Sequence, residues 1–306
     1  MPELPDVTLY VERLAALVHD TPLESVRLKS SFVVRTVEPP LETAHGKRVV
    51  SVERLGKRIV LGLEDELFVV IHLMIAGRLR WKKKGAAVTG KNGLAAFDFE
   101  RGTLLFTEAS TKKRASIHVV QGRAGLKDHD RGGLEVIDAG LEPFSAALTR
   151  NNHTLKRAMT DPRILSGIGN AYSDEILFDA GLSPFELTQS MAPEELARLY
   201  AATQEVLARF TETMRAEIGE GFPDKVTAFR EDMFVHGRYR EPCKRCESKI
   251  QRVVYAENEM NYCPKCQNQG RLLADRSLSR LMKKDWPKTA DELEQIRSNP
   301  TSNGDR

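Results

Sequence analysis

The spacing of apolar residues divides the chain into a first part rich in short strands and a second part rich in helices. Between Leu23 and about Val120, apolar and polar residues alternate over short stretches separated by Gly, Asp-Glu or Pro-Pro breaks. Many short strands at near-regular spacing favour an antiparallel β-sandwich or barrel. The predicted strands span residues 25–28, 48–52, 58–63, 67–73, 95–99 and 103–107.

After Pro143 the apolar residues recur at helical spacing. The longest helix is predicted from Pro193 to about Ile218, with Pro193 in its first turn. Its buried stripe is predicted to contain Leu196, Leu199, Val206, Phe210 and Met214. Residues 165–170 form a glycine turn before a helix over 171–178, so the predicted order is helix, two-glycine turn, helix.

A further helix is predicted near the N-terminus, over residues 7–18, with Pro5 and Asp6 as its turn and N-cap. The glycine-containing stretch 122–140 is predicted to link the strand-rich part to the helical part. The polar end of the chain has a composition typical of disorder. The predicted division is a β-sandwich over 1–131, a helical domain over 132–235, a four-cysteine module over 236–286 and a disordered tail over 287–306.

Composition excludes several classes of protein. The 306 residues are 41% hydrophobic and 29% charged, which suits two or more globular domains and excludes a wholly disordered chain. No stretch approaches the ~18 apolar residues of a membrane span, and the N-terminus lacks the features of a signal peptide. We therefore expect no membrane partner and a cytoplasmic location, at the nucleoid if the source is bacterial.

Charge is unevenly distributed along the chain and indicates the kind of partner. The net charge is only +3, but residues 237–286 hold 12 Lys or Arg against 6 Asp or Glu. A basic block on a nearly neutral body favours an anionic partner, with nucleic acid first.

The four cysteines lie within this basic block. Cys243, Cys246, Cys263 and Cys266 form the pattern C-x2-C-x16-C-x2-C. Two such pairs can place four thiolates around one Zn²⁺ ion, and a site filled by four thiolates is structural because no ligand position stays open. Disulfides are the weaker alternative in a chain without an export signal. The β-branched stretch 249–255 is predicted to be one strand of a hairpin.

Several motifs, taken in order, resemble those of the formamidopyrimidine-DNA glycosylase and endonuclease VIII family of base-excision repair enzymes. Each motif is weak alone, but their shared order over residues 1 to about 267 is specific. They are Pro2-Glu3-Leu4-Pro5-Asp6, Lys57 in Leu-Gly-Lys-Arg, His72-Leu-Met-Ile-Ala-Gly77, Glu142-Pro143, Leu155-Lys156, the segment from Gly167 to Phe178, and the cysteine module that closes in Cys263-Pro-Lys-Cys-Gln267.

The resemblance implies an α+β multidomain fold. Its parts are an N-terminal β-sandwich with a leading helix, a helix–two-turn–helix domain and a C-terminal four-cysteine zinc-finger β-hairpin, with DNA in the cleft between. It also implies a monomeric bifunctional enzyme that excises oxidised or ring-opened bases and cuts the backbone at abasic sites by β/δ-elimination.

The resemblance assigns the catalytic roles to three residues. Pro2 becomes a secondary amine once Met1 is removed, and it would attack C1′ to form a Schiff base. Glu3 would protonate the sugar ring oxygen and then shuttle protons, and Lys57 would donate a proton toward the base or a phosphate. Without the resemblance, Pro2 would shape the entry to the first helix, Glu3 would interact with the helix dipole, and Lys57 would be a solvated turn residue.

The resemblance also indicates residues that contact DNA. Asn170 matches a phosphate-binding Asn, with a helix cap as the alternative. Lys156 matches a lysine that contacts the lesion nucleotide, and Glu175 matches a Glu near the lesion; alone they would be a solvated lysine and a surface acid. The remaining candidates for DNA binding are His72, Met74, Ile75, Lys112, Lys113 and Arg114.

The sequence departs from the family pattern at two places. The family places an Arg that grips phosphates five residues before the third cysteine, where this chain has Asn258. Enzymes of the family that act on oxidised guanine fill the vacated base stack with Met, Arg and Phe, whereas this chain has Ile75 at the Met position and a different sequence over 108–116. These departures imply robust cleavage at abasic sites, activity on bulky or further-oxidised lesions or on single-stranded DNA, and weak excision of 8-oxoguanine opposite cytosine. The alternative is that Lys112, Lys113 or Arg114 takes over through a shifted loop, which would restore the usual preference.

Two other classes of protein compete with the enzyme. One is a catalytically silent zinc-finger DNA-binding protein of the same fold that recognises damaged or abasic DNA, which Asn258 favours. The other is a zinc-ribbon adaptor with an unrelated N-terminal domain. The intact Pro2, Glu3 and Lys57 favour the enzyme over both alternatives.

Overall fold

The computed structural model describes most of the chain: residues 1–224, 226, 229–255, 258–273, 287–290, 292, 293 and 295. The chain divides into two compact units, one of Met1–Glu135 with Leu207–Ala228 and one of Val136–Val206 with Phe229–Arg306. The four-cysteine segment therefore groups with the helical part. The domain borders that the sequence predicts after residues 131 and 235 stay predictions.

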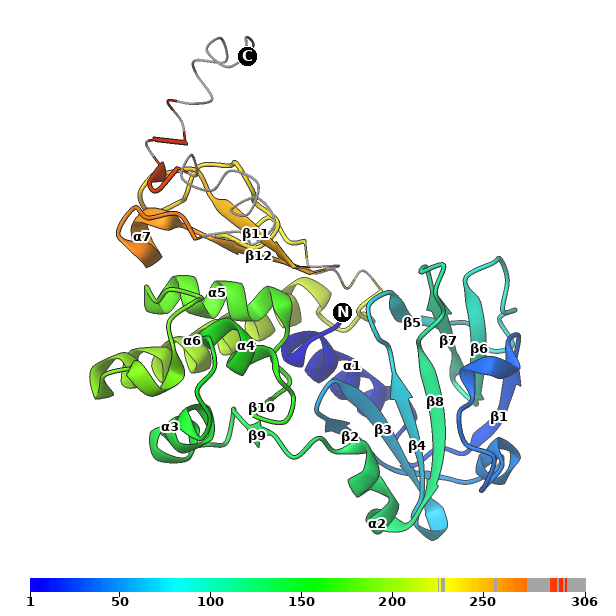
Figure 1. The fold of residues 1–306 in the computed structure, drawn as a ribbon. Helices are drawn as coiled ribbons and strands as arrows, with labels where there is room; N and C mark the ends of the chain where they lie inside the picture. Colours follow the sequence, from blue (N-terminus) through cyan, green and yellow to red (C-terminus); the bar gives the residue numbers. More distant parts are fainter. Residues whose placement is uncertain are drawn as a thin grey trace, which may run out of the picture. The chain divides into compact units, whose positions relative to one another are not determined.

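The first unit contains a leading helix and two antiparallel four-stranded sheets (Figure 1). Helix α1 spans Leu4–Val18. One sheet has the strand order β1 (Leu23–Leu28), β6 (Gly93–Phe99), β7 (Gly102–Glu108) and β5 (Gly77–Lys82). The other has the order β2 (Val49–Leu55), β3 (Arg58–Leu63), β4 (Leu67–His72) and β8 (Ser116–Gln121). The predicted sandwich with a leading helix is therefore confirmed.

One hydrophobic core joins both sheets and the helix. Phe97 and Leu104 come from one sheet, Val69 from the other, and Tyr10 and Leu14 from α1, and all five are fully buried. Burial of each such side chain contributes roughly 1.5–3 kcal/mol, so the alternating pattern of the strands is enough to set which face of each sheet is internal.

Three local predictions need correction. Helix α1 begins at Leu4 rather than at residue 7, and its N-cap is Glu3 rather than Asp6. The sequence did not predict strands β5 and β8. In β5, cations on the outward positions obscure the alternation of apolar and polar residues. The predicted linker contains a short helix, α2 (Gly122–Leu126), whose Leu126 packs on a small apolar cluster that includes Phe68.

The second unit contains the helix–two-turn–helix elements. They are α3 (Leu141–Thr149), α4 (Leu155–Thr160), the two-residue strand β10 (Leu165–Ser166) and α5 (Asn170–Ala180). Helix α6 spans Pro193–Ile218, as predicted, and its two halves belong to different units. The strand β9 (Leu134–Glu135) closes the first unit's N-terminal segment. Short 3₁₀ helices span Ser31–Val33, Leu41–Ala44, Glu64–Glu66, Lys127–His129 and Thr188–Ser190.

A β-hairpin follows, formed by β11 (Gln251–Tyr255) and β12 (Asn258–Tyr262), and then a short helix, α7 (Pro264–Asn268). Residues 287–290 belong to the tail predicted to be disordered, but they pair with residues 270–272 through backbone hydrogen bonds. Backbone pairing overrides polar composition there, so the prediction is wrong for these four residues. Residues 274–286 of the predicted module and 296–306 of the tail lie outside the described residues.

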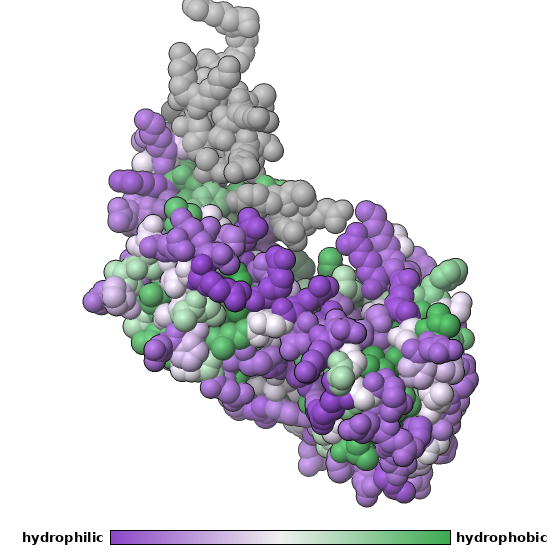
Figure 2. All heavy atoms as spheres, turned by 60° about the horizontal axis from the view of Figure 1, so that its bottom comes forward, coloured by the Kyte–Doolittle hydropathy of each residue, from purple (hydrophilic) through white to green (hydrophobic). Residues whose placement is uncertain are grey.

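On the face drawn in Figure 2, the described residues form no single large apolar area. Hydrophilic residues cover most of that face, and hydrophobic residues occur as separate small patches. Among the helices of the described residues, none is both long and apolar enough to cross a membrane.

Candidate functional site

The N-terminus of the chain is buried at the start of α1. Pro2 is buried, and the Glu3 side chain is only 3% exposed. Glu3 and Asp6 form a reciprocal capping box, in which the Glu3 backbone N–H donates to Asp6 Oδ2 at 2.8 Å. This capping box fixes the Glu3 side chain at the N-terminal end of α1.

Charged groups from three elements act on the terminal amine. Burial lowers the pKa of the Met1 α-amine below its usual value, and the charges of Arg78 and Lys57 lower it further, whereas Glu3 and Asp6 raise it. Lys57 lies in the turn between β2 and β3, next to Gly56, whose φ of 60° suits a residue without a side chain. The structure thus brings the three predicted catalytic residues to one place.

Arg78 and Asp6 also belong to this site, although the sequence assigned a catalytic role to neither of them. Arg78 lies on β5, and its guanidinium donates to the backbone oxygens of Ile75, Gly77 and Val226. Burial raises the pKa of the Asp6 carboxyl to about 7, even though its hydrogen bond from Glu3 and the charge of Arg78 lower it. In the sequence, the only feature that could have identified Asp6 as a site residue is its position within the N-terminal motif, and that position is equally consistent with a helix cap.

The pKa of Asp6 predicts a specific pH dependence. In the unfolded chain this carboxyl titrates near 3.9, so between about pH 4 and pH 7 the folded state holds a proton that the unfolded state has released. The free energy of unfolding therefore falls as pH rises through this window, by up to roughly 4 kcal/mol. We expect Asp6→Asn, whose amide oxygen still accepts from Glu3, to gain stability relative to the parent chain as pH rises from 4 to 7. Chemical denaturation of both chains across this range measures the difference.

The titration of His72 changes the free energy of unfolding with pH in the opposite direction. The effect of Asp6 is therefore measured as the difference between the parent chain and the Asp6→Asn variant. Burial lowers the pKa of His72 to about 3, and the charges of Arg58 and Lys57 act in the same direction. This loss of stability on acidification from about pH 6.5 occurs in both chains and cancels. A difference between parent and variant that stays constant from pH 4 to 7 would show that Asp6 is ionised throughout.

His72 ends β4 beside Arg58 of β3 and is held neutral by its surroundings. The rings of His118 and His129 meet edge to face nearby, at 4.6 Å between centroids, and the charges of His118 and Arg131 also act on His72. This outer end of the sheet therefore carries several potential donors to an anion, of which the sequence indicated only His72.

The turn between β4 and β5 presents an apolar tip. Ile75 is 58% exposed, and Met74 has a φ of 52°, which is rare for a residue with a side chain. The backbone N–H of Gly77 donates to the Leu73 oxygen at 2.8 Å, and a Cβ on Gly77 would lie 2.1 Å from that oxygen. The tight turn thus requires glycine and holds Ile75 outward.

The loop between β7 and β8 presents cations. Lys112, Lys113 and Arg114 are exposed. The buried Glu108 carboxylate accepts from the backbone N–H groups of Arg114 and Ala115, and the Lys113 ammonium donates to the Glu108 backbone oxygen. Glu108 therefore fixes the base of this loop, a role that the sequence did not indicate.

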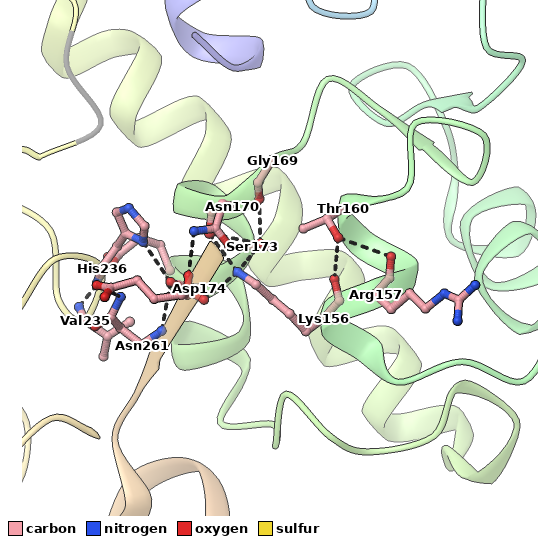
Figure 3. A network of polar contacts seen from close by, with 12 residues as sticks. Lys156, Arg157, Thr160, Gly169, Asn170, Ser173, Asp174, Val235, His236 and Asn261 are labelled. Atoms are coloured by element: carbon pink, nitrogen blue, oxygen red, sulfur yellow. Dashed lines mark hydrogen bonds and ion pairs between the residues drawn. The ribbon is translucent and has the colours of Figure 1, made fainter. Parts of the chain in front are cut away.

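In the second unit, Lys156 is part of a buried polar network (Figure 3). Its ammonium donates to the Asn170 backbone oxygen at 2.7 Å, to Ser173 Oγ at 2.7 Å and to Asp174 Oδ1 at 2.5 Å. The side chain is 12% exposed, so the alternative of a solvated helix lysine is wrong. All three protons of the ammonium are donated, and Lys156 thereby fixes the first turn of α5.

Asp174 and His236 are the centre of the same network. His236 Nδ1 lies 2.7 Å from Asp174 Oδ2, and the backbone N–H of Asn261 donates to that same oxygen at 3.0 Å. Asp174 is fully buried, so one carboxylate joins α4, α5 and the cysteine hairpin. A single acid with helical neighbours gave no signal of this role in the sequence.

Glu175 has a comparable structural role. Its carboxylate is 1% exposed and accepts the backbone N–H groups of Phe234, Val235 and His236 at 2.8–2.9 Å. Burial raises its pKa, against the effect of those three hydrogen bonds. The alternative of a surface acid is therefore wrong, and a contact of Glu175 with a lesion stays a prediction.

Asn170 is the first residue of α5, and the alternative that it caps this helix is wrong. The N-cap is Gly169, and the Asn170 amide instead donates to the Glu259 oxygen of β12 at 2.6 Å. Phosphate binding by Asn170 stays a prediction. The side chain of Asn258, where the sequence departs from the family pattern, lies outside the described residues.

The four cysteines come together as one cluster. Their Sγ atoms all lie within 4.8 Å of one another, with 3.4 Å between Cys246 and Cys263 and 3.9 Å between Cys243 and Cys266. A tetrahedral ion with Zn–S bonds of about 2.3 Å would place its sulfurs about 3.8 Å apart. The cysteines form no disulfide, and their arrangement fits a four-thiolate metal site.

Comparisons with known proteins agree with this arrangement. Residues 1–114 match the model of the formamidopyrimidine-DNA glycosylase N-terminal domain, and residues 136–219 match that of the formamidopyrimidine-DNA glycosylase H2TH domain. A formamidopyrimidine-DNA glycosylase of Solibacter usitatus is 33% identical over 275 residues, which cover 87% of this chain and 99% of that protein. Half of this chain, 49%, is 35% identical to an uncharacterized formamidopyrimidine-DNA glycosylase-like protein of Mycobacterium tuberculosis.

The fold is similar to solved structures. The MutM (FPG) protein of Thermus thermophilus is 29% identical, with a TM-score of 0.73 over 87% of this chain and 98% of that one. A Lactococcus lactis FPG mutant bound to Fapy-dG DNA shares the fold at 21% identity, with a TM-score of 0.75 over 87% of this chain and all of the other. Fold and site thus place the protein in the class of helix–two-turn–helix DNA glycosylases, which act in base excision repair. Within that class, the chain belongs to the formamidopyrimidine-DNA glycosylase family.

Proposed function

We propose that the protein is a bifunctional DNA glycosylase and abasic-site lyase that uses the amine of Pro2 as its nucleophile. The observation that carries the proposal is the buried terminus, where the pKa of the α-amine is lowered. An α-amine ordinarily titrates near 7.7–8.0, and burial at this position shifts the equilibrium toward its neutral, nucleophilic form. Removal of Met1 would place the Pro2 nitrogen at the same end of α1.

The reaction follows from the groups around this amine. The Pro2 lone pair attacks C1′, the bond from C1′ to the damaged base breaks, and the base leaves with a proton. Glu3 protonates the ring oxygen as the sugar opens to an iminium between C1′ and the Pro2 nitrogen. A proton then leaves C2′, and the 3′ phosphate departs by β-elimination; a second elimination releases the 5′ phosphate. Lys57 supplies a proton to the leaving base or neutralises a phosphate.

The DNA would be bound by residues of both units, each in the way its surroundings allow. His72 and Asn170 would donate to phosphates, and the exposed Ile75, with Met74 beside it, would fill a vacated base stack. Lys112, Lys113 and Arg114 would contact the backbone from their loop. Lys156 and Glu175 act as positioning residues, because their polar atoms are already bonded within the protein.

The metal in the cysteine cluster would be one structural Zn²⁺ ion held by four thiolates. The sulfur spacing and the absence of disulfides among the four cysteines support this ion. When bound, Zn²⁺ supplies only cross-linking, since the four thiolates leave no position for a reacting group. It would hold the β11–β12 hairpin on α5, where Asn170 contacts Glu259.

The substrates would be damaged or abasic DNA. Structures of relatives contain Fapy-dG DNA, carbocyclic 8-oxo-G DNA and abasic-site DNA. An aliphatic tip at Ile75 discriminates poorly between opposite bases, so we keep the expectation of strong abasic-site cleavage and weak excision of 8-oxoguanine opposite cytosine. A repair enzyme of chromosomal DNA would act as a monomer in the cytoplasm, at the nucleoid of a bacterial cell.

Borohydride trapping tests this function. The purified protein is incubated with a duplex that contains one abasic site, and borohydride reduces any iminium to a stable amine. We expect a one-to-one covalent adduct, and peptide mapping should place it on Pro2. An adduct on a lysine would reassign the nucleophile, and no adduct would favour the silent DNA-binding protein. A duplex without the abasic site is the control and should give no adduct.

A further inference from the structure

A basic hollow lies in the first unit beside the site of the terminal amine, and Arg78 belongs to both. Its volume is about 440 Å³, and it is formed by the edge strand β5, by β7 and by the loop that leads into β6. Four cations line it, namely Arg78, Arg80, Lys82 and Lys91, and none of the described lining residues is acidic. Pro2, Glu3 and Lys57 are not among the lining residues.

The positive charge of this hollow is only partly compensated. Arg78 is bonded to backbone oxygens, and Lys82 pairs with Asp224 at 3.1 Å. Arg80 and Lys91 are exposed, and neither forms an ion pair or hydrogen bond within the described part of the chain. Two uncompensated cations in one concave site attract an anion more strongly than the same charges on a convex surface.

The other residues that line the hollow favour a ligand that has apolar and neutral polar groups as well as a negative charge. Leu105 and Val88 provide apolar surface, while Asn92, Thr89 and Thr107 provide donors and acceptors. A volume of about 440 Å³ lies within the ~300–1,000 Å³ that small-molecule sites occupy. A phosphate ion alone would leave the apolar wall and the amide of Asn92 unused, whereas a nucleotide would use the cations, the polar groups and the apolar wall.

The hollow adjoins the two loops that carry the proposed DNA contacts. Ala76 and Ala109 line it, and the Ala109 backbone N–H donates to the Ala76 oxygen at 3.3 Å. Ala76 follows the tip at Ile75, and Ala109 begins the loop that holds Lys112 to Arg114. A ligand in the hollow would therefore contact the base of both loops.

We propose that this hollow binds a nucleotide unit other than the damaged one, with its phosphate on Arg80 and Lys91 and its base on the Leu105 wall. The nucleotide is either a free nucleoside monophosphate or a residue of the bound DNA. The second source rests on the proposed function, whereas the first does not.

Two matched double variants of the zinc-loaded full chain test the proposal. Arg80→Gln with Lys91→Gln removes the two uncompensated cations. Arg101→Gln with Arg198→Gln removes the same charge from exposed residues outside the hollow. Each protein is titrated with deoxyadenosine 5′-monophosphate, with inorganic phosphate, and with a duplex that contains a non-cleavable abasic-site analogue at several salt concentrations.

If the ligand is a free nucleotide, deoxyadenosine 5′-monophosphate should bind saturably and more tightly than inorganic phosphate. The hollow variant should then lose about tenfold in affinity or more, because charge-assisted contacts to phosphate are the strong ones. If the ligand is instead a nucleotide of the bound DNA, the slope of log K against log salt should decrease by about 0.9 for each DNA phosphate that the variant no longer binds. Only the hollow variant should show this decrease.

The proposal is overturned if the hollow variant and the control variant behave alike toward both the monophosphate and DNA. Abasic-site trapping by the same proteins separates this outcome from failure of the proposed function. A hollow variant that still forms the Pro2 adduct, but behaves like the control in both titrations, would refute the nucleotide site alone.

Discussion

Replacement of Glu3 by glutamine is expected to slow Schiff-base formation at an abasic site by on the order of 10²–10⁴-fold, the usual contribution of a positioned acid–base group. The carboxyl lies at the N-cap of α1 and acts electrostatically on the terminal amine. Glutamine can still accept the backbone hydrogen bond of the capping box, so α1 should remain intact while the proton donor is lost. Single-turnover trapping with borohydride measures the rate.

Glu42→Gln is the matched control, because Glu42 is exposed and its replacement removes the same charge from the same unit. It should trap abasic DNA at the parent rate. Affinity for a non-cleavable abasic-site analogue should change by only a few-fold in either variant. If Glu3→Gln reacts as fast as the control, Glu3 is a helix cap and the proton donor must be another group, with Asp6 the first candidate.

The parts of the fold that could be predicted are those set by local apolar spacing. Helix α6 was predicted with its observed limits, and most strands of the sandwich were found because their inward positions alternate. Strand β5 was missed because Arg78, Arg80 and Lys82 occupy its outward positions, where they resemble a solvated surface cluster. Edge strands often carry such charges, which suppress pairing with other chains and also weaken the strand signal.

The site was predictable only where its residues are close in sequence or regular in spacing. The N-terminal motif and the cysteine pattern meet this condition. The Asp174–His236 pair and the bonds from Glu175 to residues 234–236 do not, because they join positions about 60 residues apart. An acid in a helix has the same local pattern whether it is solvated or buried, and only the packed structure distinguishes the two states.

Loss of one cysteine thiolate should have the largest effect on DNA binding. Among the described residues, the cysteine segment and its hairpin pack in two small apolar clusters, one of which includes Cys243 and Cys263 themselves. Such a core is too small to fold a hairpin alone, and a structural zinc ion contributes about 10–16 kcal/mol in comparable modules. We expect Cys263→Ser to lose its zinc and most of its affinity for abasic DNA. Elemental analysis and DNA titration of the purified variant measure the two effects.

Val254→Thr, an exposed change on β11 of the same hairpin, is the control and should keep one zinc ion per chain. Because the sandwich core lies in the other unit, its cooperative unfolding should persist in Cys263→Ser. That result would separate loss of the hairpin from general unfolding. Full affinity without zinc, in the variant or after chelation of the parent chain, would show that the hairpin folds without metal, and the polar network of Asp174 and Glu175 would then be what holds it.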